Sequence, residues 1–156
     1  MKPEVVIGRL LLEKKLTLGT AESCTGGRIA GLITAVPGSS AYFKGGIVAY
    51  SNEVKQQVLS VSGTDLGKYG AVSEPVVLQM VTGARQVLKT DCAVSTSGIA
   101  GPDGGTPGKP VGTVWIAVSY KEKTVARKFH FSGCREENIL SAANAGLNML
   151  IELLDG

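Results

Sequence analysis

The sequence predicts one α/β domain over residues 1 to 156, in which helices cover both faces of a mixed central sheet. Runs rich in β-branched residues alternate with helix-like segments along the chain. Near the end, two strand-like segments follow each other across a short break, which predicts a hairpin and therefore some antiparallel pairing. No linker or internal repeat divides the chain, whose length suits a single ordinary domain.

The first part of the chain is expected to alternate helices with strands. Val6, Leu10 and Leu11 recur at helical spacing, and the Pro-Gly pair at residues 37 and 38 breaks the second helix. In chain order, the expected elements are a helix over residues 3–15, a strand over 16–22, a helix over 25–36, a strand over 45–51 and a helix over 52–60.

The second part begins with a polar loop and ends with a long helix. Ser73 is a suitable cap for a helix whose first turn tolerates a proline. Residues 101–112 are too rich in glycine and proline for regular structure, which predicts a long loop at a strand end. The expected elements are a helix over residues 74–89, a buried strand over 92–100, hairpin strands over 113–120 and 124–131, and a closing helix over 135–154.

Composition excludes several classes of protein. The formal net charge is +3 without a run of five basic residues, so bulk electrostatics do not favour nucleic-acid binding. Glu4 and Glu13 interrupt the N-terminal apolar face, unlike a secretory signal, and no apolar run is long enough to span a bilayer. Cys24, Cys92 and Cys134 form no CxxC pair, so neither a disulfide framework nor a zinc site is expected, and a reducing cytoplasm suits the chain.

Chemistry is expected where strands end, because ligands of such sheets bind outside the carboxyl ends of the strands. Three candidate turns leave there, after Glu22, Tyr50 and Ser97. A serine hydrolase usually needs a histidine base, but strand alternation puts the single histidine, His130, on a polar side with Lys128. His130 is therefore expected to be a half-exposed strand residue, and no Ser-His-Asp triad is expected.

Ser23 stands between the first strand and the second helix, and it has two interpretations. Backbone N–H groups of Thr25, Gly26 and Gly27 would point toward a developing oxyanion or a phosphate near its hydroxyl. The alternative is an ordinary helix cap, a common use of serine. Cys24 is a second possible nucleophile near a helix start, or else a small residue packed under the turn.

Lys55 is the candidate base. If Asn52 caps the following helix, Lys55 takes the third helical position, where the helix dipole disfavours a cation. Lowering a lysine pKa from about 10.4 to about 7.5 requires roughly 4 kcal/mol, whereas an exposed helix terminus supplies about 0.3 to 1 kcal/mol. Burial or another cation would have to supply the rest, and a solvated surface lysine is an equally good interpretation.

Other residues carry weaker signals. Arg135 is either a phosphate clamp or a surface arginine in a first helical turn, and Asp103 would cap a turn in the glycine-rich loop. Trp115 and Tyr50 are most simply core or sheet-edge residues. The hydroxyl-rich and glycine-rich segments match neither a P-loop nor a GxGxxG fingerprint.

Four blocks of the sequence together resemble the CinA C-terminal domain family, also described as nicotinamide mononucleotide amidohydrolases. They are AESCTGG, PGSSAYFKGGIVAYSNEVK, GAVSEPV and SGIAGPDGGTPGKPVGTVW, and the resemblance runs from about Leu16 to Arg135. It implies a three-layer α/β/α sandwich. It also implies hydrolysis of the carboxamide of nicotinamide mononucleotide to nicotinic acid mononucleotide and ammonia, without a metal or cofactor, in pyridine nucleotide salvage.

The resemblance also implies roles for individual residues. Ser23 corresponds to the family's nucleophile, Lys55 to its base, and Tyr50 to a residue that assists proton transfer. Ser40 is implied near the reacting amide, and Arg135 would bind the phosphate. On this basis the glycine-rich turn after Ser23 is expected to hold the oxyanion. The residues expected to line the nucleotide pocket are Ser97, Gly98, Ala100 and Gly101.

Two departures from the family pattern leave details open. Cys134 precedes Arg135 where many relatives carry an acidic residue, so the orientation of the arginine clamp is not settled. Relatives often place this domain behind one that resembles molybdopterin-binding proteins, whereas this chain is expected to be a stand-alone form.

A non-catalytic nucleotide-binding or competence-associated module is the alternative function, and ammonia release would distinguish it from an amidase. DNA binding is the weakest hypothesis, since no helix-turn-helix or basic stripe is visible. The expected partner is a small-molecule substrate, with neither nucleic acid nor membrane. A homodimer is expected because relatives are often dimeric.

Overall fold

A five-stranded mixed sheet forms the middle layer of the computed structural model, which describes all residues from Met1 to Gly156. The strand order is β2-β1-β3-β4-β5. β1 pairs in parallel with β2 and β3, whereas β4 runs antiparallel to β3 and to β5, which confirms the predicted hairpin. The strands are β1 (Leu18–Glu22), β2 (Phe43–Val48), β3 (Cys92–Gly98), β4 (Thr113–Tyr120) and β5 (Lys123–His130).

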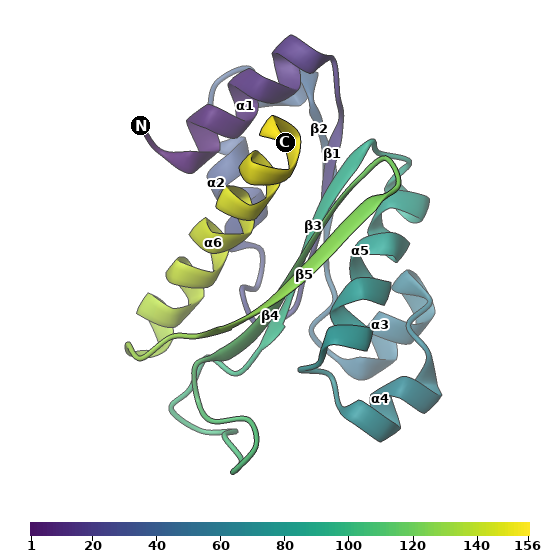
Figure 1. Ribbon diagram of the computed structural model, residues 1–156, viewed down its shortest axis with the longest axis vertical. Helices are drawn as coiled ribbons and strands as arrows, with labels where there is room; N and C mark the ends of the chain where they lie inside the picture. Colours follow the sequence, from purple (N-terminus) through teal and green to yellow (C-terminus); the bar gives the residue numbers. More distant parts are fainter.

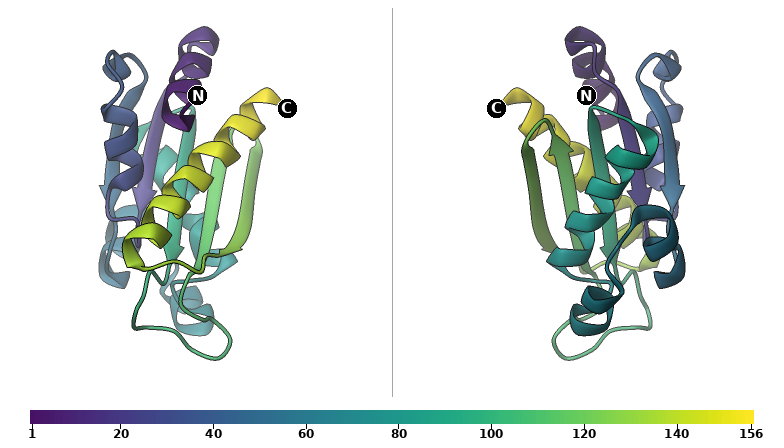
Figure 2. Two further views of the ribbon diagram at one scale, coloured as in Figure 1. Left: turned by 90° about the vertical axis from the view of Figure 1, so that its left-hand side faces the viewer. Right: turned by 90° about the vertical axis from the view of Figure 1, so that its right-hand side faces the viewer.

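Helices cover both faces of this sheet, so the three-layer α/β/α sandwich is confirmed (Figures 1 and 2). One layer contains α1 (Pro3–Lys14), α2 (Arg28–Thr34) and α6 (Arg135–Asp155). The other contains α3 (Asn52–Leu59), α4 (Gly63–Tyr69) and α5 (Glu74–Leu88). None of these helices combines the length and the apolar character needed to cross a membrane.

Two apolar cores lie on the two sides of the sheet. The larger one joins the sheet to α1, α2 and α6 and includes Ile7, Ile29 and Leu147. The smaller one joins it to α3, α4 and α5 and includes Val77 and Met80. Successive residues of the central strands point to opposite faces, and each core receives alternate side chains. This double burial explains why β1, β3 and β4 are buried along nearly their whole length, polar residues included.

Two helices differ from the sequence expectation. The helix expected over residues 25–36 begins only at Arg28, because Gly26 and Gly27 adopt positive φ angles of 56° and 99° that extend the turn after β1. The segment expected as a polar loop contains α4, whose N-terminus is capped by the Ser62 hydroxyl accepting from the Asp65 amide. Only one residue of α4, Leu66, is buried, so the sequence carries little helical apolar periodicity there.

The carboxyl ends of β1, β2 and β3 meet at one edge of the sheet because the three strands are parallel. The long loop over residues 101–112 leaves from the same edge, after β3, and lies at the bottom of Figure 1. The N-terminus of α6 also reaches this end, where Asn138 contacts the carbonyl of Ala100. Four segments that are distant in sequence therefore meet there.

Candidate active site

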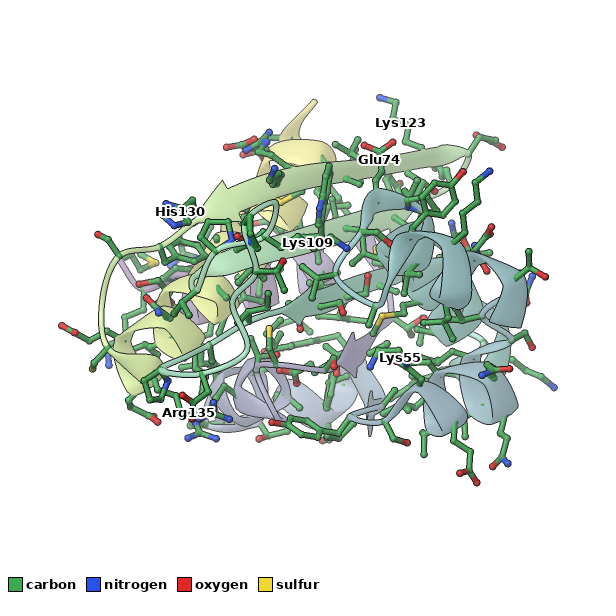
Figure 3. The ribbon with its side chains drawn as sticks, turned by 90° about the horizontal axis from the view of Figure 1, so that it is seen from below. Lys55, Glu74, Lys109, Lys123, His130 and Arg135 are labelled. Carbon is green, nitrogen blue, oxygen red and sulfur yellow. The ribbon has the colours of Figure 1, made fainter.

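A cavity of about 300 Å³ opens at this edge of the sheet. The turn after β1, the start of α3, the segment after β3 and the first residue of α6 all contribute to its wall. Figure 3 views this end of the molecule from below, with Lys55 and Arg135 labelled. The lining residues are Ser23, Cys24, Tyr50, Asn52, Lys55, Ala71, Gly98, Ile99, Ala100, Gly101, Asp103, Gly104 and Arg135.

Ser23 is held at the end of β1 by its backbone. Its amide donates to the carbonyl of Thr96 on β3, and its own carbonyl accepts from the amide of Gly26 across a tight turn. After the turn, the backbone continues through Gly26 and Gly27, which both have positive φ angles. Other residues adopt this conformation only at a cost in free energy. The side chain of Ser23 is therefore presented to the cavity from a fixed backbone.

The buried carboxylate of Glu22 fixes the same turn from below. It accepts hydrogen bonds from the hydroxyl of Thr25 and from the amides of Ile29 and Ala30, so it serves as the N-terminal cap that α2 lacks. The Thr25 hydroxyl also bonds to that of Thr96. Sequence reasoning missed Glu22, although an acidic residue directly before the candidate nucleophile was a visible signal.

Lys55 reaches Ser23 from the other helical layer. Its Nζ lies 2.9 Å from Oγ of Ser23 and 3.3 Å from the carbonyl oxygen of Tyr50, and the residue is only 1% exposed. Burial lowers the pKa of Lys55, because a charged ammonium loses its hydration there. The solvated-surface interpretation is therefore wrong for this lysine.

The cap of α3 differs from the one expected. Ser51, rather than Asn52, precedes the helix, and its hydroxyl accepts from the amide of Val54. Lys55 therefore stands one position further into the helix than the sequence suggested, and its side chain is drawn inward. Asn52 instead lines the cavity. Desolvation, not the helix terminus, is the main cause of the lowered pKa.

Cys24 also lines the cavity, but its thiol is poorly suited to attack. Burial raises the pKa of Cys24 to about 12, so the thiolate is scarce at neutral pH. Cys24 packs within the larger apolar core, as the alternative interpretation expected. Between two adjacent nucleophiles, the one with a nitrogen base at hydrogen-bonding distance is Ser23.

Tyr50 and Arg135 meet across the mouth of the cavity. Nη2 of Arg135 donates to the Tyr50 hydroxyl at 3.2 Å, and Nη1 donates to the carbonyl of Gly101 at 2.7 Å. Tyr50 is 62% exposed, so it is neither a core residue nor buried at a sheet edge. Cys134 caps α6, its amide bonded to Glu137, and Arg135 begins the helix with its guanidinium directed to the cavity wall.

The wall after β3 is held by contacts from both helical layers. Asn138, buried in α6, donates to the carbonyl of Ala100 and accepts from the amide of Gly133. Ser97 is also buried, but its hydroxyl donates to the carbonyl of Ala71 and does not line the cavity. Ser97 thus positions the segment that contains Ala71. The expectation that Ser97 lines the nucleotide pocket is wrong. Gly98, Ala100 and Gly101 do line the cavity.

The turn of Thr25, Gly26 and Gly27 does not form the wall that was expected. None of the three lines the cavity, the Thr25 side chain is bonded internally, and the Gly26 amide is taken by Ser23. Of the residues in this turn after Ser23, only Cys24 lines the cavity, and its amide donates no hydrogen bond to another residue. Its backbone N–H, and not that of either glycine, is therefore the candidate donor to an oxyanion.

Ser40 lies at the wrong end of the sheet for the expected role. It belongs to a short 3₁₀ helix, Ser39–Ala41, which precedes β2. β2 runs parallel to β1, with Phe43 beside Leu18 and Val48 beside Glu22, so Ser40 is about 15 Å or more from the cavity edge. The structure places it outside the cavity that Ser23 and Lys55 share.

Several lining residues were not singled out as site residues, among them Asn52, Ala71, Asp103 and Gly104. Asn52 was taken for a helix cap and Asp103 for a turn cap. Their positions beside the YSNEVK block and inside the SGIAGPDGG block were the available signal. Only the meeting of strand ends shows that they face one cavity.

The chain is similar to proteins from several bacteria. It is 49% identical to a CinA-like protein of Cytophaga hutchinsonii over 94% of this chain and 35% of that protein. It is 43% identical to a putative competence-damage inducible protein of Desulforudis audaxviator over 98% of this chain and 37% of that protein. The chain thus spans about a third of the length of these relatives.

Crystal structures of similar proteins share the whole fold. The competence damage-inducible protein A (ComA) of Klebsiella pneumoniae superposes with a TM-score of 0.95 at 36% identity, covering 98% of this chain and 95% of that one. The competence/damage inducible protein CihA of Agrobacterium tumefaciens gives 0.93 at 37% identity, covering 99% and 96%. The model of the CinA C-terminal domain matches residues 2–154, and the chain belongs to that family.

Proposed function

We propose that the chain hydrolyses the carboxamide of nicotinamide mononucleotide to nicotinic acid mononucleotide and ammonia, through an acyl-enzyme on Ser23. The observation that carries this proposal is the buried contact of 2.9 Å between Oγ of Ser23 and Nζ of Lys55. A serine beside a desolvated lysine with a lowered pKa is a nucleophile with its base. The nature of the substrate rests on the family resemblance.

In the first step, Ser23 Oγ attacks the amide carbon and its proton passes to the neutral amine of Lys55. The carbonyl oxygen gains the electron pair and becomes an oxyanion. The amide of Cys24, which donates to no other residue, is the donor we assign to it, since the residue after a nucleophile often serves this role. Such a donor contributes about 3 to 4 kcal/mol to the transition state in other amide hydrolases.

In the second step, the carbon–nitrogen bond breaks and ammonia leaves with a proton supplied through the Tyr50 hydroxyl, which Lys55 restores. Water then attacks the ester carbon and gives its proton to Lys55, which returns it to Oγ of Ser23 as the carbon–oxygen bond breaks and the carboxylic acid leaves. The role of Tyr50 rests on the family resemblance: its backbone carbonyl accepts from Lys55, and its hydroxyl, which accepts from Arg135, belongs to a residue that lines the same cavity.

Arg135 is the proposed phosphate contact. Two of its N–H groups bind Gly101 and Tyr50, which fixes the guanidinium plane and leaves further N–H groups for an anion. The cavity volume of about 300 Å³ is at the lower end of the range for small-molecule sites. We propose that the nicotinamide ring lies near Ser23 and the phosphate near Arg135.

A catalytically silent binding module is the second candidate, because names of relatives refer to competence and damage induction and not to hydrolysis. A module of this kind would bind the nucleotide in the same cavity and release no ammonia.

We also propose that the protein acts in the cytoplasm. Its three free cysteines agree with a reducing compartment.

The test is ammonia release from nicotinamide mononucleotide, measured with and without a chelator for the wild type, Ser23→Ala and Ser141→Ala. Ser141 is an exposed serine in α6 and serves as the matched control. We expect release by the wild type and Ser141→Ala in either condition, and none by Ser23→Ala. Equal release by Ser23→Ala would move the nucleophile elsewhere, whereas nucleotide binding without release by the wild type would favour the silent module.

A further inference from the structure

A second cavity, of about 390 Å³, lies on the α5 side of the sheet and shares no lining residue with the candidate active site. It lies between the start of α5, the end of α4, the loop over residues 101–112 and the hairpin of β4 and β5. The side chains of greatest interest in its wall are those of Tyr69, Glu74, Lys109, Trp115 and Lys128.

Trp115 supplies an aromatic surface to this cavity. The residue is half-buried, packs on one side against the smaller apolar core, and lines the cavity with its uncovered part. Tyr69, 41% exposed, is a second aromatic residue in the lining. Stacking on an indole or phenol favours planar aromatic groups and tolerates different bases.

Two lysines put positive charge in the wall of this cavity. Lys128 is the direct cross-strand partner of Trp115, so both side chains leave the same face of the sheet. Lys109 Nζ donates to the carbonyl of Tyr69, and an ammonium group has further N–H donors available for a ligand. Glu74 is the single carboxylate in the wall, so the cavity carries a net positive charge at neutral pH.

We propose that this cavity binds a nucleoside monophosphate, with the base stacked on Trp115 and the phosphate held by Lys109 and Lys128. A flat apolar surface with adjacent ammonium groups matches both halves of such a molecule. An uncharged nucleoside would lack the phosphate contacts, and inorganic phosphate would lack the stacking. The proposal is independent of amide hydrolysis, because the cavity contains neither Ser23 nor Lys55.

Tryptophan fluorescence offers a direct test, because Trp115 is the only tryptophan of the chain and does not line the candidate active site. Adenosine 5′-monophosphate is the probe, with adenosine and inorganic phosphate as comparisons. We expect a saturable change in emission with the nucleotide, weaker binding of adenosine, and no saturable change with phosphate. Absence of a saturable change with the nucleotide up to millimolar concentration would overturn the proposal, as would equal binding of adenosine.

Matched variants locate the binding site. Lys128→Ala should raise the Kd by about threefold or more, the scale of an exposed ion pair. Lys123→Ala removes the same charge from the other end of β5, far from His130, and should leave the Kd unchanged (Figure 3). Arg135→Ala should also leave it unchanged. An equal effect of Lys128→Ala and Lys123→Ala, or loss of binding in Arg135→Ala, would contradict this site.

Calorimetry with Trp115→Leu gives an independent readout. Loss of a stacked base should weaken nucleotide binding by roughly fivefold or more, since such stacking contributes about 1 to 3 kcal/mol per base. An unchanged Kd in this variant would show that the indole is not part of the site. Binding to the wild type would then have to occur elsewhere.

Discussion

The reactivity of individual residues in this site is set by burial more than by charge partners. Lys55 and Cys24 line the same cavity, and desolvation acts on their two pKa values in opposite directions. The neutral form is favoured in both cases, as an amine for Lys55 and as a thiol for Cys24. One environment therefore favours the neutral amine of Lys55, the proposed base, and disfavours the thiolate of Cys24 beside Ser23, the proposed nucleophile.

Replacement of the base should nearly abolish turnover. We expect Lys55→Met to lower amide hydrolysis by about 10²- to 10⁴-fold, the usual contribution of a general base. Lys68→Met, an exposed lysine in α4, is the control and should keep full activity. The measurement is ammonia release at saturating substrate. Full turnover by Lys55→Met at neutral pH would rule out the serine–lysine scheme.

The same lysine should make stability depend on pH. The pKa of Lys55 is lowered in the folded chain, while in the unfolded chain it is about 10.4. Between these values the unfolded chain binds more protons, so the free energy of unfolding contributed by Lys55 rises with pH. Below the lowered pKa, the penalty of burying the ammonium is fully present.

Urea unfolding of the wild type and Lys55→Met across this pH range measures the effect. The stability of the wild type relative to the variant should increase as the pH rises toward about 10.4. The thiols of Cys24 and Cys92, whose pKa values burial raises to about 12, act oppositely but are present in both proteins. A difference that stays constant with pH would mean that Lys55 keeps its ordinary pKa.

The three cysteines should differ in reactivity. Cys24 and Cys92 are buried with pKa values near 12, whereas Cys134 is exposed at the start of α6. A thiol titration of the native protein should therefore detect one rapidly reacting group, and all three after denaturation. Cys134→Ser should remove the fast reaction, and Cys24→Ala should retain amide hydrolysis. Loss of activity in a stable, folded Cys24→Ala would contradict the assignment of Ser23.

At the scale of elements, the site depends on how closely α3 approaches α5. Gly83 in α5 faces the last turn of α3, and a Cβ there would clash with the backbone carbonyl oxygen of Leu59. A glycine is needed because the neighbouring atom belongs to the backbone and cannot rotate away. This contact fixes α3, and with it Lys55, against the rest of the layer.

Two glycine-to-alanine substitutions should therefore have opposite effects. Gly83→Ala forces α3 and α5 apart and should lower the free energy of unfolding by about 1 to 3 kcal/mol. Gly67→Ala in α4 meets nothing within 4 Å and should raise it by roughly 0.5 to 1 kcal/mol. Urea unfolding compares the two. A stable Gly83→Ala protein with full activity would show that the contact is dispensable.

At the scale of the whole molecule, the sheet edge joins two helical layers into one site. Lys55 comes from α3 in one layer, while Arg135 and Asn138 come from the start of α6 in the other. Ser23 lies between them at the end of a central strand. Neither layer contains the site alone, so cooperative folding of the entire domain is required for its geometry.

A homodimer is the expected state in solution, on the basis of the family resemblance. Light scattering coupled to size exclusion should give twice the chain mass of 16.1 kDa. The measurement should be repeated at high salt and at low protein concentration, because a weak association would dissociate under these conditions. A stable dimer would keep the doubled mass. A mass of 16.1 kDa under all conditions would show that the chain is a monomer.

Sequence pattern predicted the fold well, because periodicity and turn residues are local. The five strands, the hairpin and five of the helices follow from apolar spacing, glycine and proline. The helix α4 was not predicted, because it buries only Leu66 and so shows little apolar periodicity. Ser23 and Lys55 were candidates from local pattern, whereas Tyr50 and the catalytic roles came from the family resemblance. The structure places all three residues at one cavity.

The sequence by itself determined the order of the elements and singled out Ser23 and Lys55 as the candidate nucleophile and base. Only the tertiary structure decided that Lys55 is buried beside Ser23, that Ser97 positions Ala71, and that Ser40 lies at the opposite end of the sheet. The physical reason is that burial and distance depend on how helices and strands pack. Desolvation, which sets the pKa of Lys55, exists only once both layers have closed on the sheet.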